Sequence, residues 1–228
     1  MNHPTDIRRA RALRPRLLDT FCCQGGAGMG YHLAGFDVTG VDSSPQPRYP
    51  FTFIQAEAVA FIREYGAEFD FIHASPPCQH DSKCQRIRKN DHPDLIAPTR
   101  AALEVTGRPW VIENVGDAVP KLRDPVMLCG TMFRLETYRH RFFETGGWSL
   151  PRPAHPAHLV PQAKMGRPIP PGHYGQFIGN FSGVDHARKV MGVPWMNRDG
   201  IRECVPPAYT QWLGTHALAS LRPEAVAA

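Results

Sequence analysis

Short apolar runs alternate along the first two thirds of the chain with segments whose apolar residues recur at helical spacing. The runs predict strands at 17–21, 36–41, 69–74 and 110–112, and the segments between them predict helices at about 28–34, 57–65 and 98–106. Alternation of strands and helices is typical of a mostly parallel sheet with helices on both faces. The pattern therefore predicts an α/β fold.

The last third of the chain is organised differently. A further strand is predicted at 139–144, whereas 146–184 is rich in proline and predicts neither helix nor strand. Helical periodicity returns at 185–191, and a helix with proline at its start is predicted at 206–221. We divide the chain into a basic leader (1–15), a core (16–145), an irregular insertion (146–184) and C-terminal helices that complete the core (185–228).

Composition places the chain among ordinary soluble proteins. Of its 228 residues, 42% are hydrophobic and 21% are charged. The apolar stretches are all shorter than the ~20 residues that cross a bilayer, so we expect no membrane association. The first residues lack the apolar core of a signal peptide, and we therefore expect the six cysteines to be reduced thiols in a cytoplasm.

The net charge of +5 and the sequence pI near 9.0 suit a polyanionic partner. The arginines of the leader predict a solvated surface run. A second basic cluster follows Cys78 along the chain and favours a loop that binds a phosphate backbone. Its members are Lys83, Arg86, Arg88 and Lys89.

The pentapeptide Ser-Pro-Pro-Cys-Gln at 75–79 directly follows the predicted strand at 69–74. Open α/β sheets bind ligands at the carboxyl ends of their strands. Two prolines stiffen the turn that places the Cys78 thiol there, and nucleophilic catalysis needs a thiol that is exposed and fixed. Because most cysteines are small core residues, the motif alone does not establish a nucleophile.

A glycine-rich turn joins the first predicted strand to the first helix. Glycines let the backbone approach a ligand closely, and a helix N-terminus offers unpaired N–H groups. Asp42 ends the next strand, where it could bind ribose hydroxyls, and Asp19 at the end of the first strand could bind an amine. The pattern predicts a nucleotide-type cofactor site, with a structural turn and a helix cap as the alternative.

An acid and an arginine pair complete the candidate chemistry. Glu113 ends the strand at 110–112, and neighbouring parallel strands could bring it beside Cys78, where a buried acid can exchange protons with a reacting ring. Arg139 and Arg141 are two residues apart, so in a strand both would point to one face and suit a phosphate or a base edge. An ion pair for the acid and a solvated edge strand for the arginines are the alternatives.

Taken in order, these motifs resemble those of the cytosine-5 DNA methyltransferase family, whose fold is Rossmann-like and binds S-adenosylmethionine. The resemblance covers nearly the whole chain outside 146–184, and the composition is similar to that of compact phage or prophage enzymes, so a role in restriction–modification is expected. The matching residues are Asp19, Phe21, Gly25 and Gly26 in the first cofactor motif, Asp42 as the ribose-binding acid, Pro76, Cys78 and Gln79 in the nucleophile loop, Glu113 in the base-holding motif, Arg139 and Arg141 as the arginine pair, and Val205 in the closing motif.

The resemblance implies methylation of a cytosine flipped out of double-stranded DNA. Cys78 would attack carbon 6, Glu113 would hold the ring nitrogen and amino group, and Arg141, supported by Arg139, would contact the base carbonyl. Carbon 5 would take the methyl group from S-adenosylmethionine, and loss of its proton would expel the thiol. The basic loop from Lys83 to Lys89 would close over the phosphates, and Gln79 would also contact the DNA.

Three departures from the family pattern stand out. Cys22-Cys23-Gln24 replaces a small Ala-Gly step, Glu57 stands where an adenine-contacting aspartate is expected, and Glu203 adds a charge near the methionine end of the cofactor. The insertion is also too short for an independent domain without metal or disulfide support. We expect it to be an ordered target-recognition loop pinned to the core, which reads a short DNA site through His155, His158, Lys164, Arg167 and His173.

Other interpretations remain open. The same mechanism could act on RNA or transfer a bulkier group, or the chain could be a catalytically silent DNA-binding relative. An NAD-type oxidoreductase would explain the glycine turn and Asp42 but leaves Cys78 and Glu113 without a role. Zinc bound by Cys78, Cys84, His80 and His73 has irregular ligand spacing, so no metal is expected. We expect a monomer.

Overall fold

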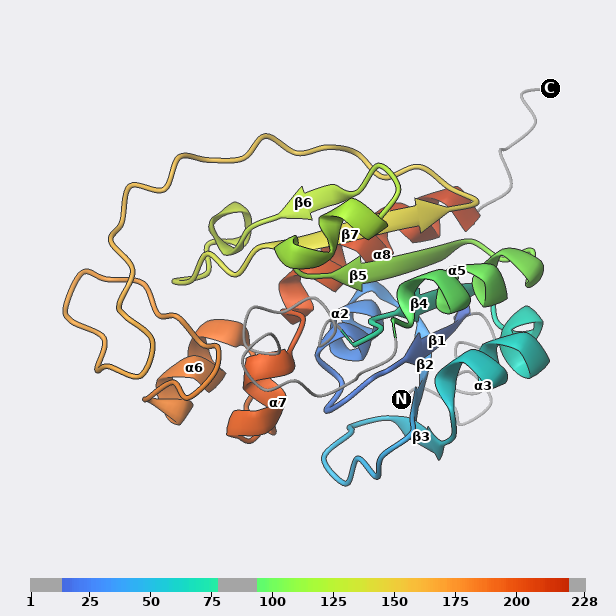
Figure 1. Cartoon of the computed structure of the whole chain (residues 1–228), viewed down its shortest axis with the longest axis horizontal. Coiled ribbons are helices and arrows are strands. Elements are labelled where there is room, and N and C mark those ends of the chain that lie inside the picture. The colour runs from blue at the N-terminus through green and yellow to red at the C-terminus, as the bar shows by residue number, and fades with distance from the viewer. Residues whose placement is uncertain (1–13, 78–93, 222–228) are drawn as a thin grey trace, which may run out of the picture.

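A seven-stranded sheet forms the centre of the computed structural model, which describes residues 14–77 and 94–221 (Figure 1). The strands run in the order β3-β2-β1-β4-β5-β7-β6. Only β7 is antiparallel to its neighbours; the other pairings are parallel. The strands are β1 (Arg16–Thr20), β2 (Asp37–Asp42), β3 (Thr52–Gln55), β4 (Phe71–Ala74), β5 (Trp110–Asn114), β6 (Val126–Leu128) and β7 (Arg141–Gly146). The predicted α/β fold with a mostly parallel sheet is confirmed.

Helices cover both faces of this sheet (Figure 1). The α-helices are α2 (Gly26–Ala34), α3 (Ala58–Tyr65), α5 (Ile96–Val105), α6 (Val184–Met191), α7 (Arg198–Glu203) and α8 (Pro207–Leu221), with short 3-10 helices η1 (Gly66–Glu68), η2 (Gly116–Lys121) and η3 (Gly130–Phe133). Side chains alternate across a strand, so Phe71 packs with α2 and α8 while Ile72 packs with α3 and α5. Burial on both faces explains why the central strands are continuous apolar runs.

The structure corrects several predicted elements. The strand expected at 139–144 begins at Arg141, because Arg139 has a left-handed backbone with φ 32°. The strands β3 and β6 and the helix α7 were not predicted, since each has only three to six residues, too few to show a clear periodicity. Between β7 and α6 the described chain forms only the isolated bridge Gln162–Tyr174, as the proline-rich pattern predicted.

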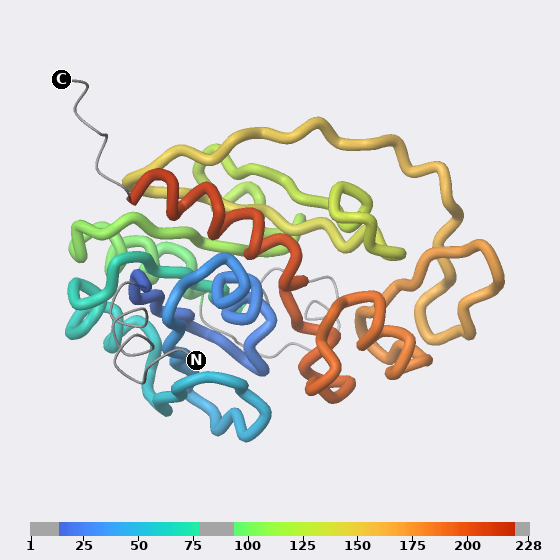
Figure 2. The backbone as a smooth tube through the Cα atoms, turned by 180° about the vertical axis from the view of Figure 1, so that it is seen from behind, coloured from blue at the N-terminus to red at the C-terminus, as the bar shows by residue number. Residues whose placement is uncertain are grey.

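The topology fixes where a ligand site can lie. Strand β1 has β2 on one side and β4 on the other, and this reversal of strand order is the point where open α/β sheets bind ligands. Helices α6 and α7 lie beyond the carboxyl ends of the parallel strands (Figure 1). The irregular segment passes the edge strand β6 on its way to them (Figure 2). Among the helices in the described ranges, none combines the length and apolar character needed to cross a membrane.

Candidate active site

The carboxyl ends of β4 and β5 place Ser75 beside Glu113. The strands are parallel neighbours in which Ala74 pairs with Ile112, so the next residue of each comes level with the other. Glu113 is 5% exposed and accepts a hydrogen bond from the Ser75 hydroxyl. His73 Nε2 lies 2.9 Å from Ser75 Oγ, and its Nδ1 lies 3.0 Å from the Tyr31 hydroxyl. The buried polar side chains Tyr31, His73 and Ser75 are therefore linked in a series that ends at the Glu113 carboxylate.

Arg141 brings a positive charge to this carboxylate from the start of β7. Its Nε lies 2.8 Å from Glu113 Oε1, yet the contact lacks the alignment of a hydrogen bond, and this buried oxygen has no hydrogen-bond partner among the described residues. Burial raises the pKa of Glu113, against the opposing effects of Arg141 and Ser75. The site thus holds a buried acid with one oxygen that can still bond to a ligand.

Asn114 fixes the turn that precedes the predicted nucleophile. Its Nδ2 donates to the carbonyl oxygen of Pro76 at 3.0 Å, and its Oδ1 accepts from the backbone N–H of Val115 at 2.9 Å. The two strand ends are therefore joined directly as well as through the sheet. The remaining predicted residues of this loop lie outside the described residues: Cys78, Gln79, Lys83, Arg86, Arg88 and Lys89.

The first cofactor motif and the closing motif meet in one small cavity of about 30 Å³. Its lining includes Asp19, Phe21, Gly26, Ser75, Glu203 and Val205. These residues come from the β1–α2 turn, the end of β4 and the segment between α7 and α8, so parts of the sequence far from one another share one wall. The structure thus brings together residues of the first cofactor motif and of the closing motif, which the resemblance had assigned to one cofactor site.

Asp19 is the most deeply buried acid of this cavity, with 1% of its surface exposed. Its Oδ2 accepts from the Tyr49 hydroxyl at 3.0 Å, and its Oδ1 has no partner among the described residues. Burial raises the pKa of Asp19 to about 7, although the hydrogen bonds from Tyr49 and the Gly28 N–H oppose the shift. A cationic group would therefore find an unsatisfied acceptor here.

Two other predicted cofactor residues make backbone contacts. Asp42, at the end of β2, accepts at 3.0 Å from the N–H groups of Cys23 and Ser44. Glu57 caps α3, because its two oxygens accept from the N–H groups of Val59 and Ala60 at 3.0 and 2.7 Å. For Glu57, the helix-cap role accounts for both carboxylate oxygens.

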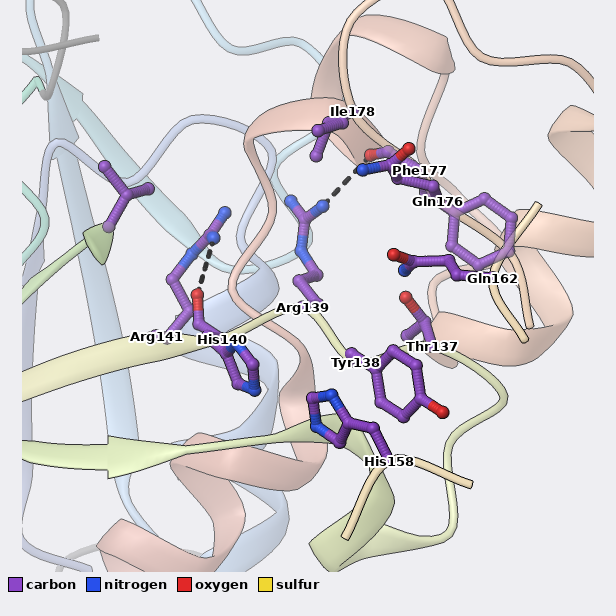
Figure 3. Close-up of a pocket in the computed structure, with 11 residues that line it drawn as sticks. Thr137, Tyr138, Arg139, His140, Arg141, His158, Gln162, Gln176, Phe177 and Ile178 are labelled. Atoms are coloured by element: carbon purple, nitrogen blue, oxygen red, sulfur yellow. Dashed lines mark hydrogen bonds between the residues drawn. The ribbon is translucent and has the colours of Figure 1, made fainter. Parts of the chain in front are cut away.

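Arg139 lines a larger cavity of about 350 Å³, together with Arg141, and Figure 3 shows both guanidinium groups on the same side of the chain. The Arg139 guanidinium donates to four backbone carbonyls at 2.8–3.0 Å, those of Phe177, Ile201, Arg202 and Cys204. It therefore ties the irregular segment to α7 and to the closing motif. Lys164 and Arg167 are exposed on the irregular segment.

Sequence reasoning missed Tyr49. Its ring lies against the backbone of β2, where a Cβ on Gly40 would come within 2.3 Å of the ring, and its hydroxyl reaches Asp19. A glycine inside a strand is a signal of such close approach, although it does not identify the partner.

Comparison with known proteins places the fold. The structure is similar to a protein assigned as a DNA modification methyltransferase and encoded within a prophage of E. coli, with a TM-score of 0.58 and 14% identity over 91% of this chain and 99% of the other. It is equally similar to the Entamoeba histolytica methyltransferase EhMeth, with a TM-score of 0.58 and 10% identity over 92% and 99% of the two chains. No family model and no curated protein matches the sequence. The chain has the Rossmann-like α/β fold of methyltransferases.

Proposed function

We propose that the protein is a DNA (cytosine-5)-methyltransferase that uses S-adenosylmethionine and forms a covalent adduct through Cys78. The observation that carries the proposal is the junction of β4 and β5. There a buried acid with a raised pKa, Glu113, lies beside the turn that leads into Cys78, and Asn114 holds that turn in place. The folds of the prophage and Entamoeba proteins agree with this assignment.

Glu113 and Arg141 suit the edge of a cytosine ring. Burial raises the pKa of the Glu113 carboxyl, and in its protonated form this group would donate to a ring nitrogen while its free oxygen accepts from the exocyclic amino group. The Arg141 guanidinium supplies a positive charge for the base carbonyl. Together they would draw electron density from the ring and make carbon 6 open to attack.

The proposed reaction balances around one sulfur atom. The Cys78 thiolate forms a bond to carbon 6, and carbon 5 becomes nucleophilic. S-adenosylmethionine supplies the methyl group to carbon 5 and leaves as S-adenosylhomocysteine. Loss of the carbon-5 proton to a base then restores the ring bond and expels the thiolate.

The residues around the smaller cavity fit that cofactor. The unpartnered Oδ1 of Asp19 and the carboxylate of Glu203 suit its cationic amino-acid end, and Phe21 offers an apolar surface. Asp42 would exchange its backbone contacts for ribose hydroxyls. The cavity is smaller than the cofactor, so binding would require Glu203 to move from its 3.7 Å contact with the Cys23 thiol.

Labelled S-adenosylmethionine incubated with the protein and genomic DNA tests the proposal. The expected product in the nucleoside digest is 5-methylcytosine, absent with Cys78→Ser and retained with the matched control Cys84→Ser. An oligonucleotide carrying 5-fluorocytosine should trap a covalent complex through Cys78, because fluorine cannot leave as the proton does. Folded, cofactor-binding protein that methylates RNA only, or that forms no adduct, would contradict the proposal.

A further inference from the structure

One cysteine and three histidines converge outside the candidate active site. Cys129 directly follows β6 and His140 directly precedes β7, and the pairing of Leu128 with Arg141 brings the two level across the strands. His155 and His158 come from the irregular segment. Within this Cys–His cluster, the four potential ligand atoms all lie within 4.8 Å of one another.

Three of the six separations in the Cys–His cluster are close to those of a tetrahedral metal site. Cys129 Sγ lies 3.4 Å from His158 Nε2, and His155 Nε2 lies 3.1 Å from His158 Nε2 and 3.3 Å from His140 Nε2. Bond lengths of about 2.0–2.1 Å to nitrogen and 2.3 Å to sulfur place tetrahedral ligands roughly 3.3–3.6 Å apart. The atoms are therefore spaced as though around one ion.

Hydrogen bonding alone does not account for this convergence. A neutral imidazole nitrogen carries either one proton or one lone pair, so His155 Nε2 can make a well-directed hydrogen bond to one of its two imidazole neighbours but not to both. A shared cation would satisfy all three lone pairs at once.

The surroundings hold the ligands in place. The His158 ring stacks on Tyr138 at 3.6 Å and on His140 at 5.0 Å between ring centroids. The Thr131 hydroxyl lies 3.1 Å from Cys129 Sγ and can donate to a thiolate there. Support of this kind around the ligands is a regular feature of metal sites.

We propose that Cys129, His140, His155 and His158 bind one structural Zn²⁺ ion. One thiolate and three imidazoles form a donor set typical of zinc, and four protein ligands leave no open position for catalysis. The ion would join the β6–β7 edge of the sheet to a segment that has no helix or strand of its own. It would also fix one wall of the larger cavity, since two of its ligands, His140 and His158, line that cavity together with Tyr138 (Figure 3). This inference stands independently of the proposed function.

The metal content of the purified full chain tests the site. Protein prepared without chelators or a histidine tag should contain about one zinc ion per chain by mass spectrometry. Cys129→Ser and His158→Ala should each lower the content at least fivefold, whereas His173→Ala, a histidine of the same segment outside the cluster, should keep it. Zinc retained in both cluster variants would assign the ion to other residues and overturn the proposal.

The visible spectrum of Co²⁺ bound to the wild-type protein tests the site without relying on whether the variants fold. Wild-type protein, stripped of metal and given one equivalent of Co²⁺, should develop the visible bands of tetrahedral cobalt and a thiolate-to-metal charge-transfer band. The charge-transfer band should be absent from folded Cys129→Ser protein. Folded wild-type protein that takes up neither zinc nor cobalt, or that shows octahedral cobalt without thiolate, would refute the site.

Discussion

The end of β5 and the irregular segment after β7 are held in place by different means. Glu113 projects from a strand whose backbone is paired on both sides and whose neighbours are buried. The irregular segment has no such ladder, and it depends on separate contacts with Arg139, Tyr138 and the Cys–His cluster. The paired strands set the geometry of a site on the sheet, whereas an irregular segment must be held in place by individual side-chain contacts along its length.

The largest expected effect on stability comes from removing Arg139, whose contacts hold the irregular segment. Replacing Arg139 by Met should lower the free energy of unfolding by about 3–5 kcal/mol, because four buried carbonyls lose their donor. Urea unfolding monitored by tryptophan fluorescence measures the loss. Arg139→Lys keeps the charge, but the lysine ammonium cannot reach all four carbonyl oxygens. The free energy of unfolding of this variant should therefore lie between those of the wild type and the Met variant. A loss below about 1 kcal/mol for the Met variant would show that the segment is held elsewhere.

On the sheet side, Glu113→Gln should separate activity from stability. Turnover should fall by about 10²–10⁴-fold, since the glutamine cannot exchange a proton with the base. The backbone pairing of β5 does not depend on this side chain, so the isosteric amide should leave the variant folded, with the loss of stability limited to the cost of Arg141 without its counter-charge. Single-turnover methylation and urea unfolding of the same preparation make the comparison. Full activity in this variant would remove Glu113 from the chemistry.

Asp19→Asn probes the buried acid of the smaller cavity through pH. The pKa of Asp19 is raised to about 7, so between pH 4 and 7 the unfolded chain releases a proton that the folded protein keeps. Wild-type stability should therefore decline across this window relative to the Asn variant, by roughly 2–4 kcal/mol, and level off above pH 7.

Urea midpoints from pH 4.5 to 8 measure this difference, with the exposed Asp117→Asn as control. Under the proposed function, Asp19→Asn should also weaken cofactor binding. A stability difference independent of pH would mean that Asp19 is ionised throughout.

The same contrast explains how far the sequence could be interpreted. The strands β1, β4 and β5 are buried on both faces, and their apolar runs predicted the sheet. The predicted meeting of Glu113 with Cys78 lies outside the described residues, but Ser75, at the start of the same motif, lies beside Glu113. The contacts of Arg139 with four carbonyls depend on where the chain returns 38–65 residues later, which no local pattern encodes. The His-x-x-His spacing at 155–158 was visible, but its link to Cys129 required the β6–β7 pairing.

The smallest predicted effect on stability comes from the Tyr138 hydroxyl, which joins the sheet side of the molecule to the irregular segment. The Tyr138 hydroxyl donates to the carbonyl of Val160 and accepts from the Val160 N–H at 3.1 Å, while the ring stacks on His158. Tyr138→Phe keeps the ring and removes both hydrogen bonds, so unfolding should become easier by about 1–2 kcal/mol. Zinc content should stay unchanged because the stacking surface remains. Hydrogen exchange should increase at Val160 and not in β5, and equal increases in both would show that the irregular segment and the sheet open as one unit.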